Sequence, residues 1–412
     1  MVRNWAGNVT FAAQQLHRPD SVDELQHLVA ATPRIRALGT GHSFNRIADT
    51  PGDLVTIAGI AGESVLDEVT MTVEVRAGAT YAEVGAELAA SGWALHNLGS
   101  LPHISVAGAC ATGTHGSGDT NACLAAAAVA VEFVRGDGAL VRVPREDPAF
   151  PGSVIALGAL GVVTRLTLAV EPAFELRQDV WLDAPLDTVA ERLDEIMSCG
   201  YSVSLFTDWS RPDVIDKIWV KSRTDAALAD GRQWGARPAD RPQHPITGED
   251  PSAATAQLGA PGLWHERLPH FRAEFTPSVG HEQQSEYLLP REYGPDALLA
   301  LRGIDLRPAL AVCEVRTVAG DRMWLSPCHD RDTVAFHFTW VDNDDLVHRA
   351  VTDIERAFAS FDARPHWGKV FAADPEQVAA HYPQLAGVRE LAALHDPDRR
   401  FGNAFLERFL YR

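Results

Sequence analysis

Long apolar runs, signal sequences and an excess of basic residues are all missing from this 412-residue chain. No window approaches the 18 or so apolar residues that a membrane-spanning helix needs, and the alanine-rich run from Ala122 to Val131 is short and ends at Glu132. The amino terminus has no charged segment followed by an apolar one, so a secretory leader is not expected. Acidic residues outnumber basic ones by 55 to 36, giving a net charge of −19, which argues against nucleic acid or an anionic membrane as a partner.

Cysteine is also scarce, because the chain has five, an odd number spread over a long sequence. This favours reduced thiols in a cytoplasmic protein over a disulfide framework. No Cys/His cluster has zinc spacing, so we expect no metal. We therefore expect a soluble, monomeric, cytoplasmic protein whose partners are small molecules.

The familiar nucleotide motifs are absent too. No Gly-x-Gly-x-x-Gly opens a helix, and no Gly-Lys-Ser/Thr follows a glycine loop. A small NAD-dependent dehydrogenase and a P-loop enzyme are therefore disfavoured.

A different glycine loop is present, from Leu38 to Asn45, directly after a short apolar strand predicted at residues 35–38. Glycines at this point permit a tight turn whose successive N–H groups could hold a phosphate or pyrophosphate, with the Thr40 and Ser43 hydroxyls as further donors. His42 stands within the loop. A neutral imidazole is a nucleophile that could carry a covalently attached cofactor, although a loop histidine could also do no more than form a hydrogen bond.

A second stretch, from Ser100 to Gly118, consists mostly of small and hydroxyl-bearing residues. Backbone made of such residues can approach a flat ligand closely. A flexible linker does not account for the run, because apolar residues lie on both sides and no charge occurs before Asp119.

The length favours two domains. In the first part, a capping box predicts a helix over 21–31, alternation predicts a strand over 72–77, Thr80 begins a helix that ends near Gly92, and 129–143 is typical of a hairpin. In the second part, we expect a helix over 186–197, strands over 201–209 and 214–221 and a helix over 346–361. Residues 230–285 have little periodicity and are expected to form a long irregular segment that covers a site.

Two later strands, over 310–318 and 333–341, carry polar residues with a period of two. Glu314 and Arg316 share one face of the first strand, and His337 and Thr339 share one face of the second strand. If the bulky residues of both strands face a core, these four line one polar surface. An ordinary exposed sheet face with a cross-strand ion pair would show the same pattern.

Together these stretches resemble the vanillyl-alcohol-oxidase type of FAD flavoprotein and, within it, the family of aldonolactone and alditol oxidases. The resemblance covers nearly the whole chain. It is carried by Gly39-Thr40-Gly41-His42-Ser43, the run 100–118, Leu160-Gly161-Val162-Val163-Thr164, Glu314-Val315-Arg316, His337-Phe338-Thr339 and His366-Trp367-Gly368-Lys369.

The resemblance implies an α+β fold of two domains: an FAD-binding domain of the vanillyl-alcohol-oxidase (PCMH) type over 1–172 and a substrate domain built on an antiparallel sheet over 173–362, with 363–412 returning to the first domain. It implies FAD bonded covalently through its 8α-methyl to His42. The cofactor-binding residues that it implies are Ala37, Leu38, Gly39, Thr40, Gly41, His42, Ser43, Ser100, Ser105, Gly108, Thr112, Gly113, Thr114, His115, Val162 and His366.

The implied activity is oxidation of the terminal primary alcohol of an alditol such as xylitol or sorbitol to the aldehyde, with O2 reduced to H2O2. Polyol contacts are implied for Ser100, Glu314, Arg316, Thr339 and Lys369, with Gln284 as a further candidate in the irregular segment. Developing negative charge needs cations, which Arg316 and Lys369 supply. The sequence leaves Lys369, Glu314 and His337 open as the proton acceptor.

Two other hypotheses compete with this one: an aldonolactone oxidase or dehydrogenase of the same fold, and a flavin-carrying binding protein without turnover.

Gly99, next to Ser100, has no side chain that would block approach to a flavin, which favours reaction with O2.

Overall fold

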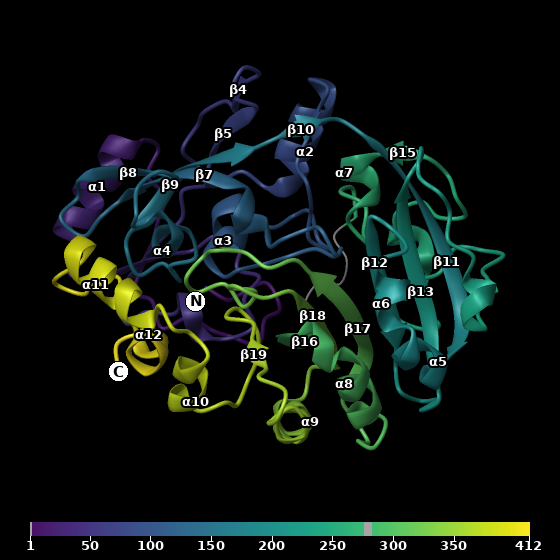
Figure 1. The fold of residues 1–412 in the computed structure, drawn as a ribbon. Coiled ribbons are helices and arrows are strands. Elements are labelled where there is room, and N and C mark those ends of the chain that lie inside the picture. Colours follow the sequence, from purple (N-terminus) through teal and green to yellow (C-terminus); the bar gives the residue numbers. More distant parts are fainter. Residues whose placement is uncertain (1, 276–281) are drawn as a thin grey trace.

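The computed structural model describes residues 2–275 and 282–412. In this part of the chain, residues 2–172 contain a parallel sheet of three short strands and an antiparallel sheet of five (Figure 1). The parallel sheet has the order β1 (Leu16–His17), β3 (Asp53–Val55), β2 (Ile35–Ala37). The antiparallel sheet has the order β4 (Val65–Asp67), β5 (Thr72–Arg76), β9 (Val162–Ala169), β7 (Ala128–Val134), β8 (Leu140–Pro144). The predicted 72–77 strand and the 129–143 hairpin are confirmed.

Two helices of this region, α1 and α2, begin where the sequence predicts them. The Ser21 side chain caps α1, and Thr80 and Glu83 form a capping box at the start of α2. The helices are α1 (Val22–Ala31), α2 (Tyr81–Ala90), α3 (Val106–Ala111) and α4 (Phe150–Val154), with 3-10 turns over 46–48 and 124–127.

A second, larger antiparallel sheet of nine described strands forms the other half of the molecule (Figure 1). Its order is β14 (Arg237–Pro238), β11 (Glu175–Pro185), β13 (Val214–Arg223), β12 (Ser202–Thr207), β17 (Leu310–Val318), β18 (Thr333–Val341), β16 (Glu282–Pro290), β19 (Arg364–Pro365), with β15 (Gly262–Leu263) paired to β11. The α+β expectation with an antiparallel second sheet is confirmed.

Helices cover one face of this sheet. They are α5 (Leu186–Glu191), α6 (Leu193–Met197), α8 (Gly294–Leu301) and α9 (Asp344–Ala357), with 3-10 turns over 231–234 and 291–293. A further 3-10 turn covers 251–253, and α7 (Trp264–Arg267) lies near the upper edge of the sheet. Val315, Phe336, Phe338 and Trp340 pack with these helices in one buried core. The alternation of the strands therefore leaves their polar residues on the opposite face.

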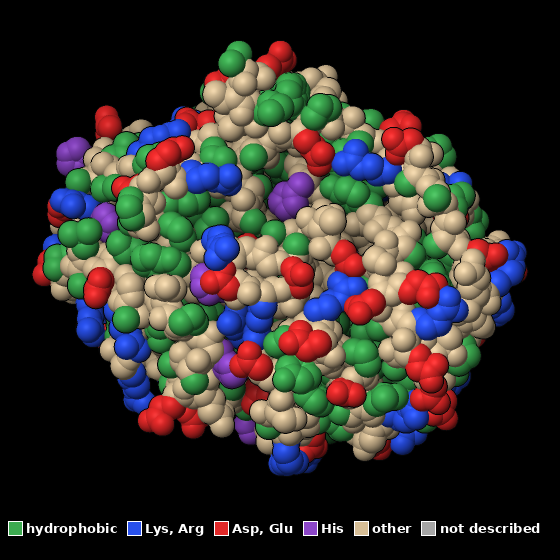
Figure 2. All heavy atoms as spheres, in the orientation of Figure 1, with side chains coloured by type: hydrophobic (Ala, Val, Ile, Leu, Met, Phe, Trp, Pro, Cys, Tyr) green, Lys and Arg blue, Asp and Glu red, His purple; other side chains and the backbone are tan. Residues whose placement is uncertain are grey.

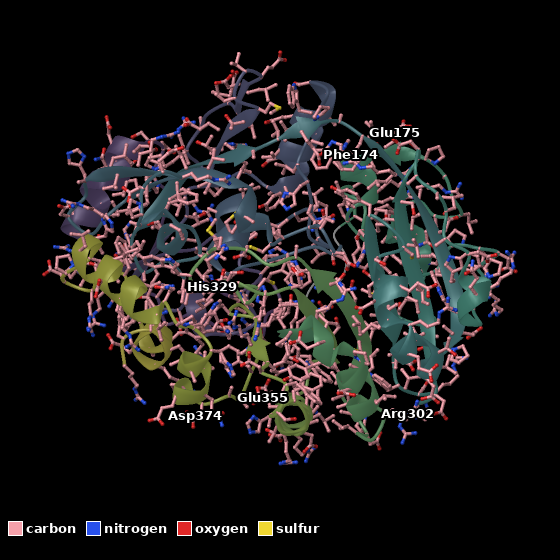
Figure 3. All side chains as sticks on the ribbon, viewed as in Figure 1. Phe174, Glu175, Arg302, His329, Glu355 and Asp374 are labelled. Atoms are coloured by element: carbon pink, nitrogen blue, oxygen red, sulfur yellow. The ribbon has the colours of Figure 1, made fainter. Side chains whose placement is uncertain are left out.

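The chain passes between the two halves at β10 (Glu171–Pro172), which pairs with β6 (Trp93–Ala94). Figure 3 labels Phe174 and Glu175 at this crossing. The Arg223 guanidinium lies 4.0 Å from the centre of the Phe174 ring, a cation–π contact that joins the crossing to β13.

The carboxyl-terminal helices are α10 (Pro375–Ala380), α11 (Leu385–His395) and α12 (Ala404–Phe409). Helix α11 contacts α4, and Val388 and Leu406 belong to the same buried core as residues of β5, β7 and β9. The end of the chain thus packs on elements from residues 72–169, as the adjacent yellow and blue-green segments of Figure 1 show.

Three sequence expectations are corrected. The helix expected over 186–197 is interrupted at Arg192, which separates α5 from α6, and α9 begins and ends earlier than 346–361. The segment expected to be irregular over 230–285 ends sooner, because 282–285 already belong to β16. Residues 276–281 lie outside the described residues.

On the face shown in Figure 2, acidic and basic side chains are interspersed, with no broad area of positive charge. Among the described residues, no helix combines the length and apolarity that crossing a membrane requires.

Candidate active site

The glycine loop of residues 38–45 leaves the parallel sheet at the end of β2, as expected. Gly41 has a φ of +75°, a conformation that side chains disfavour. The loop is tied to a distant segment, because the backbone N–H of Phe44 donates to the Gly368 carbonyl at 2.7 Å and the Asn45 amide donates to the carbonyls of Trp367 and Lys369 at 2.8 Å each. Two motifs more than 300 residues apart in sequence are thereby joined.

The backbone N–H groups of residues 39 to 43 donate to no group in the described part of the chain. All five residues line a cavity of about 410 Å³ that lies between the two halves of the molecule. Successive free N–H groups facing a cavity are the arrangement that binds phosphate groups.

His42 is half-buried in this loop. Its ring stacks on Trp5 with the ring centres 4.9 Å apart, and its Nδ1 lies 3.0 Å from the Thr40 hydroxyl. Burial and the nearby His103 lower the pKa of His42 to about 4, so the imidazole is neutral at pH 7 and keeps a nitrogen lone pair.

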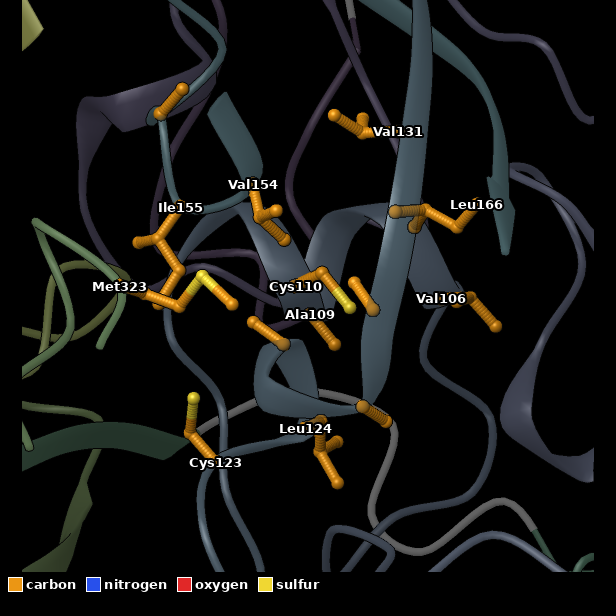
Figure 4. Packing of buried hydrophobic residues seen from close by; sticks show 14 of the residues in the cluster. Val106, Ala109, Cys110, Cys123, Leu124, Val131, Val154, Ile155, Leu166 and Met323 are labelled. Carbon is orange, nitrogen blue, oxygen red and sulfur yellow. The ribbon is translucent and has the colours of Figure 1, made fainter. Parts of the chain in front are cut away.

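The run from Ser100 to Gly118 is ordered and contains α3, which lies next to the loop. A Cβ on Gly39 or Gly108 would lie 2.6 or 2.7 Å from the Ser105 Oγ, so both glycines permit this close approach. Figure 4 shows Ala109 and Cys110 of α3 packed among Val131, Leu166 and Met323 of the core. We call residues 38–45 and 100–118 the loop side of the cavity.

The opposite wall is formed by the polar face of the large sheet. Glu314 of β17 pairs directly with His337 of β18, and Val312 pairs with Thr339. Glu314 and Arg316 are 3% and 4% exposed, so this is a buried charged surface and not an ordinary exposed face. The prediction that Glu314, Arg316, His337 and Thr339 line one surface is confirmed.

Glu286 of β16 is a charged residue at the centre of this wall that the sequence reasoning missed. One carboxylate oxygen lies 2.5 Å from the Arg316 guanidinium and 3.3 Å from His115 Nε2, and the other lies 2.8 Å from the Lys369 ammonium. Burial acts to raise the pKa of Glu286, but Lys369, His115 and Arg316 outweigh it and hold this pKa well below its usual range.

Glu314 is ionised for a similar reason. Burial favours its neutral form, but Arg316 and His270 outweigh burial and lower the pKa of Glu314 well below its usual range. Burial also lowers the pKa of Lys369, and Glu286 only partly offsets this. The cavity wall therefore holds two carboxylates against Arg316 and Lys369 in close contact.

Gln284 lies on β16, not in an irregular segment, and its place is fixed from both ends. Its amide nitrogen donates to Glu282 at 2.8 Å, and its amide oxygen accepts from His337 Nε2 at 3.1 Å. Burial and Lys369 lower the pKa of His337 to about 4. Its Nδ1 is thus an acceptor, and it lies 3.5 Å from the second oxygen of Glu314, also an acceptor. A substrate hydroxyl that approaches from the cavity can donate its one proton to either of them.

We call this wall the sheet side: Gln284, Glu286, Glu314, Arg316, His337, Thr339 and Lys369. His270 and Phe271, from the segment before residue 276, also line the cavity. His270 Nε2 lies 2.7 Å from Glu314. Neither Glu286 nor His270 has a motif around it, although the alternation of Tyr287 and Leu289 with Gln284 and Glu286 could have indicated β16.

The structure brings nearly all of the predicted site residues to one cavity. Those lining it are Ala37, Leu38, Gly39, Thr40, Gly41, His42, Ser43, Ser100, Ser105, Gly108, Thr112, Thr114, His115, Val162, Gln284, Glu314, Arg316, His337, Thr339, His366 and Lys369. Gly113 is the exception. Gly113 has a φ of +73°, and a Cβ at this position would lie 3.0 Å from Pro327. Its backbone conformation and its packing therefore both account for the glycine.

Comparisons with known proteins agree with this arrangement. A family model described as "FAD binding domain" matches residues 13–144, and one described as "D-arabinono-1,4-lactone oxidase" matches residues 279–409. An alditol oxidase of Streptomyces sp. is 50% identical over 99% of both chains. The chain belongs to the alditol oxidase family. Within this family's wider group, an L-gulono-1,4-lactone dehydrogenase of Mycobacterium tuberculosis is 29% identical over 99% of this chain and 98% of its own.

The fold is shared with more distant proteins of known structure. A cholesterol oxidase from B. sterolicum superimposes with a TM-score of 0.77 over 99% of this chain and 96% of its own, at 14% identity. The FAD-binding model makes FAD the cofactor of this family member, and the residues present fit it. The free N–H groups of residues 39–43 suit the pyrophosphate, and Gly39 and Gly108 keep the cavity open where a Cβ would close it.

Proposed function

We propose that the protein is an FAD-dependent oxidase that converts the terminal primary alcohol of alditols of the xylitol and sorbitol type to the aldehyde, with O2 reduced to H2O2. The observation that carries this proposal is the sheet side. Glu314 and Arg316 are buried and Lys369 is mostly buried, and all three lie opposite the loop side of one cavity, in a chain that is 50% identical to an alditol oxidase.

FAD, when bound, supplies an acceptor for hydride from the alcohol carbon and a route for electrons to O2. The residues of the chain supply the rest. Arg316 and Lys369 stabilise negative charge that develops on the alcohol oxygen. Glu286 holds both cations in place, which fixes their positions without removing their charge.

In this proposal the alcohol proton passes to Nδ1 of His337. This atom is unprotonated at neutral pH, it donates to no group among the described residues, and the ionised Glu314 beside it stabilises the imidazolium that forms. Ser100, Thr339, Gln284 and Glu314 then bind the remaining hydroxyls. A site with this many fixed donors and acceptors disfavours substrates that lack one hydroxyl.

We further propose that His42 carries FAD as a covalent 8α-histidyl link, which its position in the cavity and its neutral imidazole support. The remaining members of the loop side, with Val162 and His366, are the proposed cofactor contacts. The division into 1–172, 173–362 and 363–412 is proposed on the two sheets and the packing of α11 on α4. The cytoplasmic location and the monomeric state stay predictions.

A second candidate is oxidation of an aldonolactone, favoured by the match of residues 279–409 to the lactone oxidase model. The purified protein with its flavin, mixed anaerobically with xylitol and then with a γ-lactone, distinguishes the two. Bleaching of the flavin absorbance by xylitol, with recovery in air and H2O2 production, supports the alditol oxidase. Bleaching by the lactone alone supports the alternative, and no bleaching by either supports a binding protein without turnover. Acid denaturation then tests the His42 link, because a covalent flavin stays with the precipitated chain.

A further inference from the structure

A buried lysine that the proposed mechanism does not use lies beside the sheet side, on the same face of the sheet as Arg316. Lys221 on β13 is 1% exposed. Its ammonium donates to the carbonyl of Leu268, to the carbonyl of Pro269 at 3.1 Å and to Nδ1 of His270 at 3.2 Å. A lysine is costly to bury, so a location next to the site with all of its donors directed at one short segment calls for an explanation.

His270 connects this lysine to the cavity. Its Nε2 lies 2.7 Å from one oxygen of Glu314, and its backbone N–H donates to the carbonyl of Ser100 at 3.1 Å. Its ring is held edge-on by Phe206 and Trp219, with ring centres 5.6 and 5.3 Å away. The imidazole therefore has a fixed place between Lys221 and a residue that lines the cavity.

Both neighbours demand the same tautomer. Glu314 is ionised and can only accept, so the hydrogen bond between the two forms only when the proton is on Nε2 of His270. Burial lowers the pKa of His270 to about 4, so the ring has a single N–H at neutral pH and Nδ1 must accept. Lys221 provides the donor that Nδ1 requires, and it can do so as an ammonium or as an amine.

We propose that Lys221 and His270 are positioning residues: Lys221 locks His270 in its Nε2–H tautomer, and His270 then holds one oxygen of Glu314 so that the other is presented to a substrate hydroxyl. The proposal rests on the proposed function for the identity of the substrate, a polyol. A histidine bound to a metal is oriented in a similar way, because a second residue forms a hydrogen bond to its other ring nitrogen. Here the histidine binds a carboxylate instead of a metal.

The first test compares two substitutions of His270 in the FAD-loaded protein. In His270→Gln, the amide can donate to Glu314 and accept from Lys221, whereas in His270→Leu it can do neither. We expect His270→Leu to raise the KM for xylitol roughly 10- to 100-fold, the effect of losing a hydrogen bond to a charged group, with a smaller change in kcat. His270→Gln should recover most of that loss. Equal KM values for the two variants, at equal flavin content, would show that His270 only fills space.

The second test needs no turnover. In protein with 15N-labelled histidine, the His270 resonances, assigned by their loss in His270→Gln, should show a protonated Nε2 and an unprotonated Nδ1. Lys221→Met removes the donor at similar length, and we expect mixed tautomers and a weaker affinity for xylitol. The control is Lys217→Met, on the same strand. Lys217 is also buried but donates to Pro245 and Thr247, so this variant should leave the His270 tautomer unchanged.

The outcomes separate the two proposals. An unchanged tautomer and unchanged xylitol affinity in Lys221→Met would overturn the role of Lys221. If the unsubstituted protein neither binds nor oxidises polyols, the proposed function fails. The tautomer of His270 in Lys221→Met still decides whether Lys221 determines the protonated nitrogen of His270. If Lys221→Met does not fold, the comparison of His270→Gln with His270→Leu decides whether His270 positions Glu314.

Discussion

The two walls of the cavity are built in different ways. The loop side offers backbone: glycines without a Cβ, hydroxyls and N–H groups that donate to no described group. The sheet side offers charged side chains that contact one another at 2.5 to 2.8 Å within a buried surface. Substitutions that add atoms should therefore disrupt the loop side, whereas substitutions that remove a charge should disrupt the sheet side.

This difference also separates their energetics. A methyl group added to a tightly packed loop costs about 1–3 kcal/mol, because the chain can shift by tenths of an ångström. Removing one member of a buried ion cluster leaves its partners charged and unpaired, which costs about 3–5 kcal/mol. The sheet side should be the more sensitive of the two.

The largest effect is expected for Glu286→Gln. The substitution keeps the shape of the side chain but leaves Arg316 and Lys369 without their shared carboxylate, so both cations should move. We expect kcat/KM for xylitol to fall about 1,000-fold or more and the free energy of unfolding to fall by about 3–5 kcal/mol. Steady-state kinetics and denaturant unfolding measure the two quantities.

A matched control for this variant is Asp179→Asn, which breaks the Arg177–Asp179 pair on the exposed part of β11. Because that pair is about 30% exposed, its loss should cost less than about 1 kcal/mol and leave kcat/KM unchanged. If Glu286→Gln behaved like Asp179→Asn, the sheet side would not depend on its central carboxylate.

The loop side is tested by Gly39→Ala. The new Cβ would lie 2.6 Å from the Ser105 Oγ, so the Ser105 side chain must rotate or the loop must shift. We expect the binding of FAD that precedes the covalent link to weaken roughly 10- to 100-fold, seen as a lower ratio of flavin to protein absorbance in the purified variant. Gly59→Ala is the control, because the contacts of its Cβ would be 3.6 Å or longer. Full flavin content in Gly39→Ala would show that the loop has room that its glycines do not need.

The sequence is sufficient to predict the loop side because its parts are contiguous. Gly39 to Ser43 and the run 100–118 each carry their signal in neighbouring residues, and both fold as expected. Gly113 shows the limit, since its glycine serves contact with Pro327, a residue more than 200 positions away. Composition alone does not distinguish a glycine that faces a ligand from one that packs on protein.

The sheet side is only half predictable. Glu314, Arg316, His337 and Thr339 follow from period-two alternation on two strands. Glu286 is harder to predict because β16 follows directly on a segment rich in Pro, Gly and His, whose irregular composition obscures the alternation of the strand. His270 and Lys221 were missed because their roles arise from tertiary contacts between β13, β17 and the segment near residue 270.

A pH titration of stability probes the sheet side through His337 and through His270, which contacts Glu314. Burial lowers the pKa values of His270 and His337 to about 4. Between about pH 6.5 and pH 4 the unfolded chain binds more protons than the folded one, so the free energy of unfolding should fall as the pH falls through this range. We expect about 1–3 kcal/mol for each histidine. Denaturant unfolding at several pH values measures the slope, and His270→Gln should make it shallower. An equal slope would assign the acid sensitivity elsewhere.

The smallest effect is expected at Gly99, where the loop side and the sheet side meet. A Cβ there would make ordinary contacts, 3.6 Å from Ile104 and 3.8 Å from Thr114, so Gly99→Ala should fold and bind FAD normally. Its methyl group would nevertheless enter the cavity that Gly99 lines next to Ser100. We expect O2 to reoxidise the reduced flavin about 10-fold more slowly, while anaerobic reduction by xylitol changes little, because a loss of one decade corresponds to about 1.4 kcal/mol at the barrier. Stopped-flow absorbance measures the two half-reactions separately.

If Gly99→Ala reacts with O2 as fast as the parent protein, the approach of O2 does not pass Gly99. If both half-reactions slow together, the methyl group disturbs the whole site, and Gly99 belongs with Gly39 among the residues that a Cβ displaces.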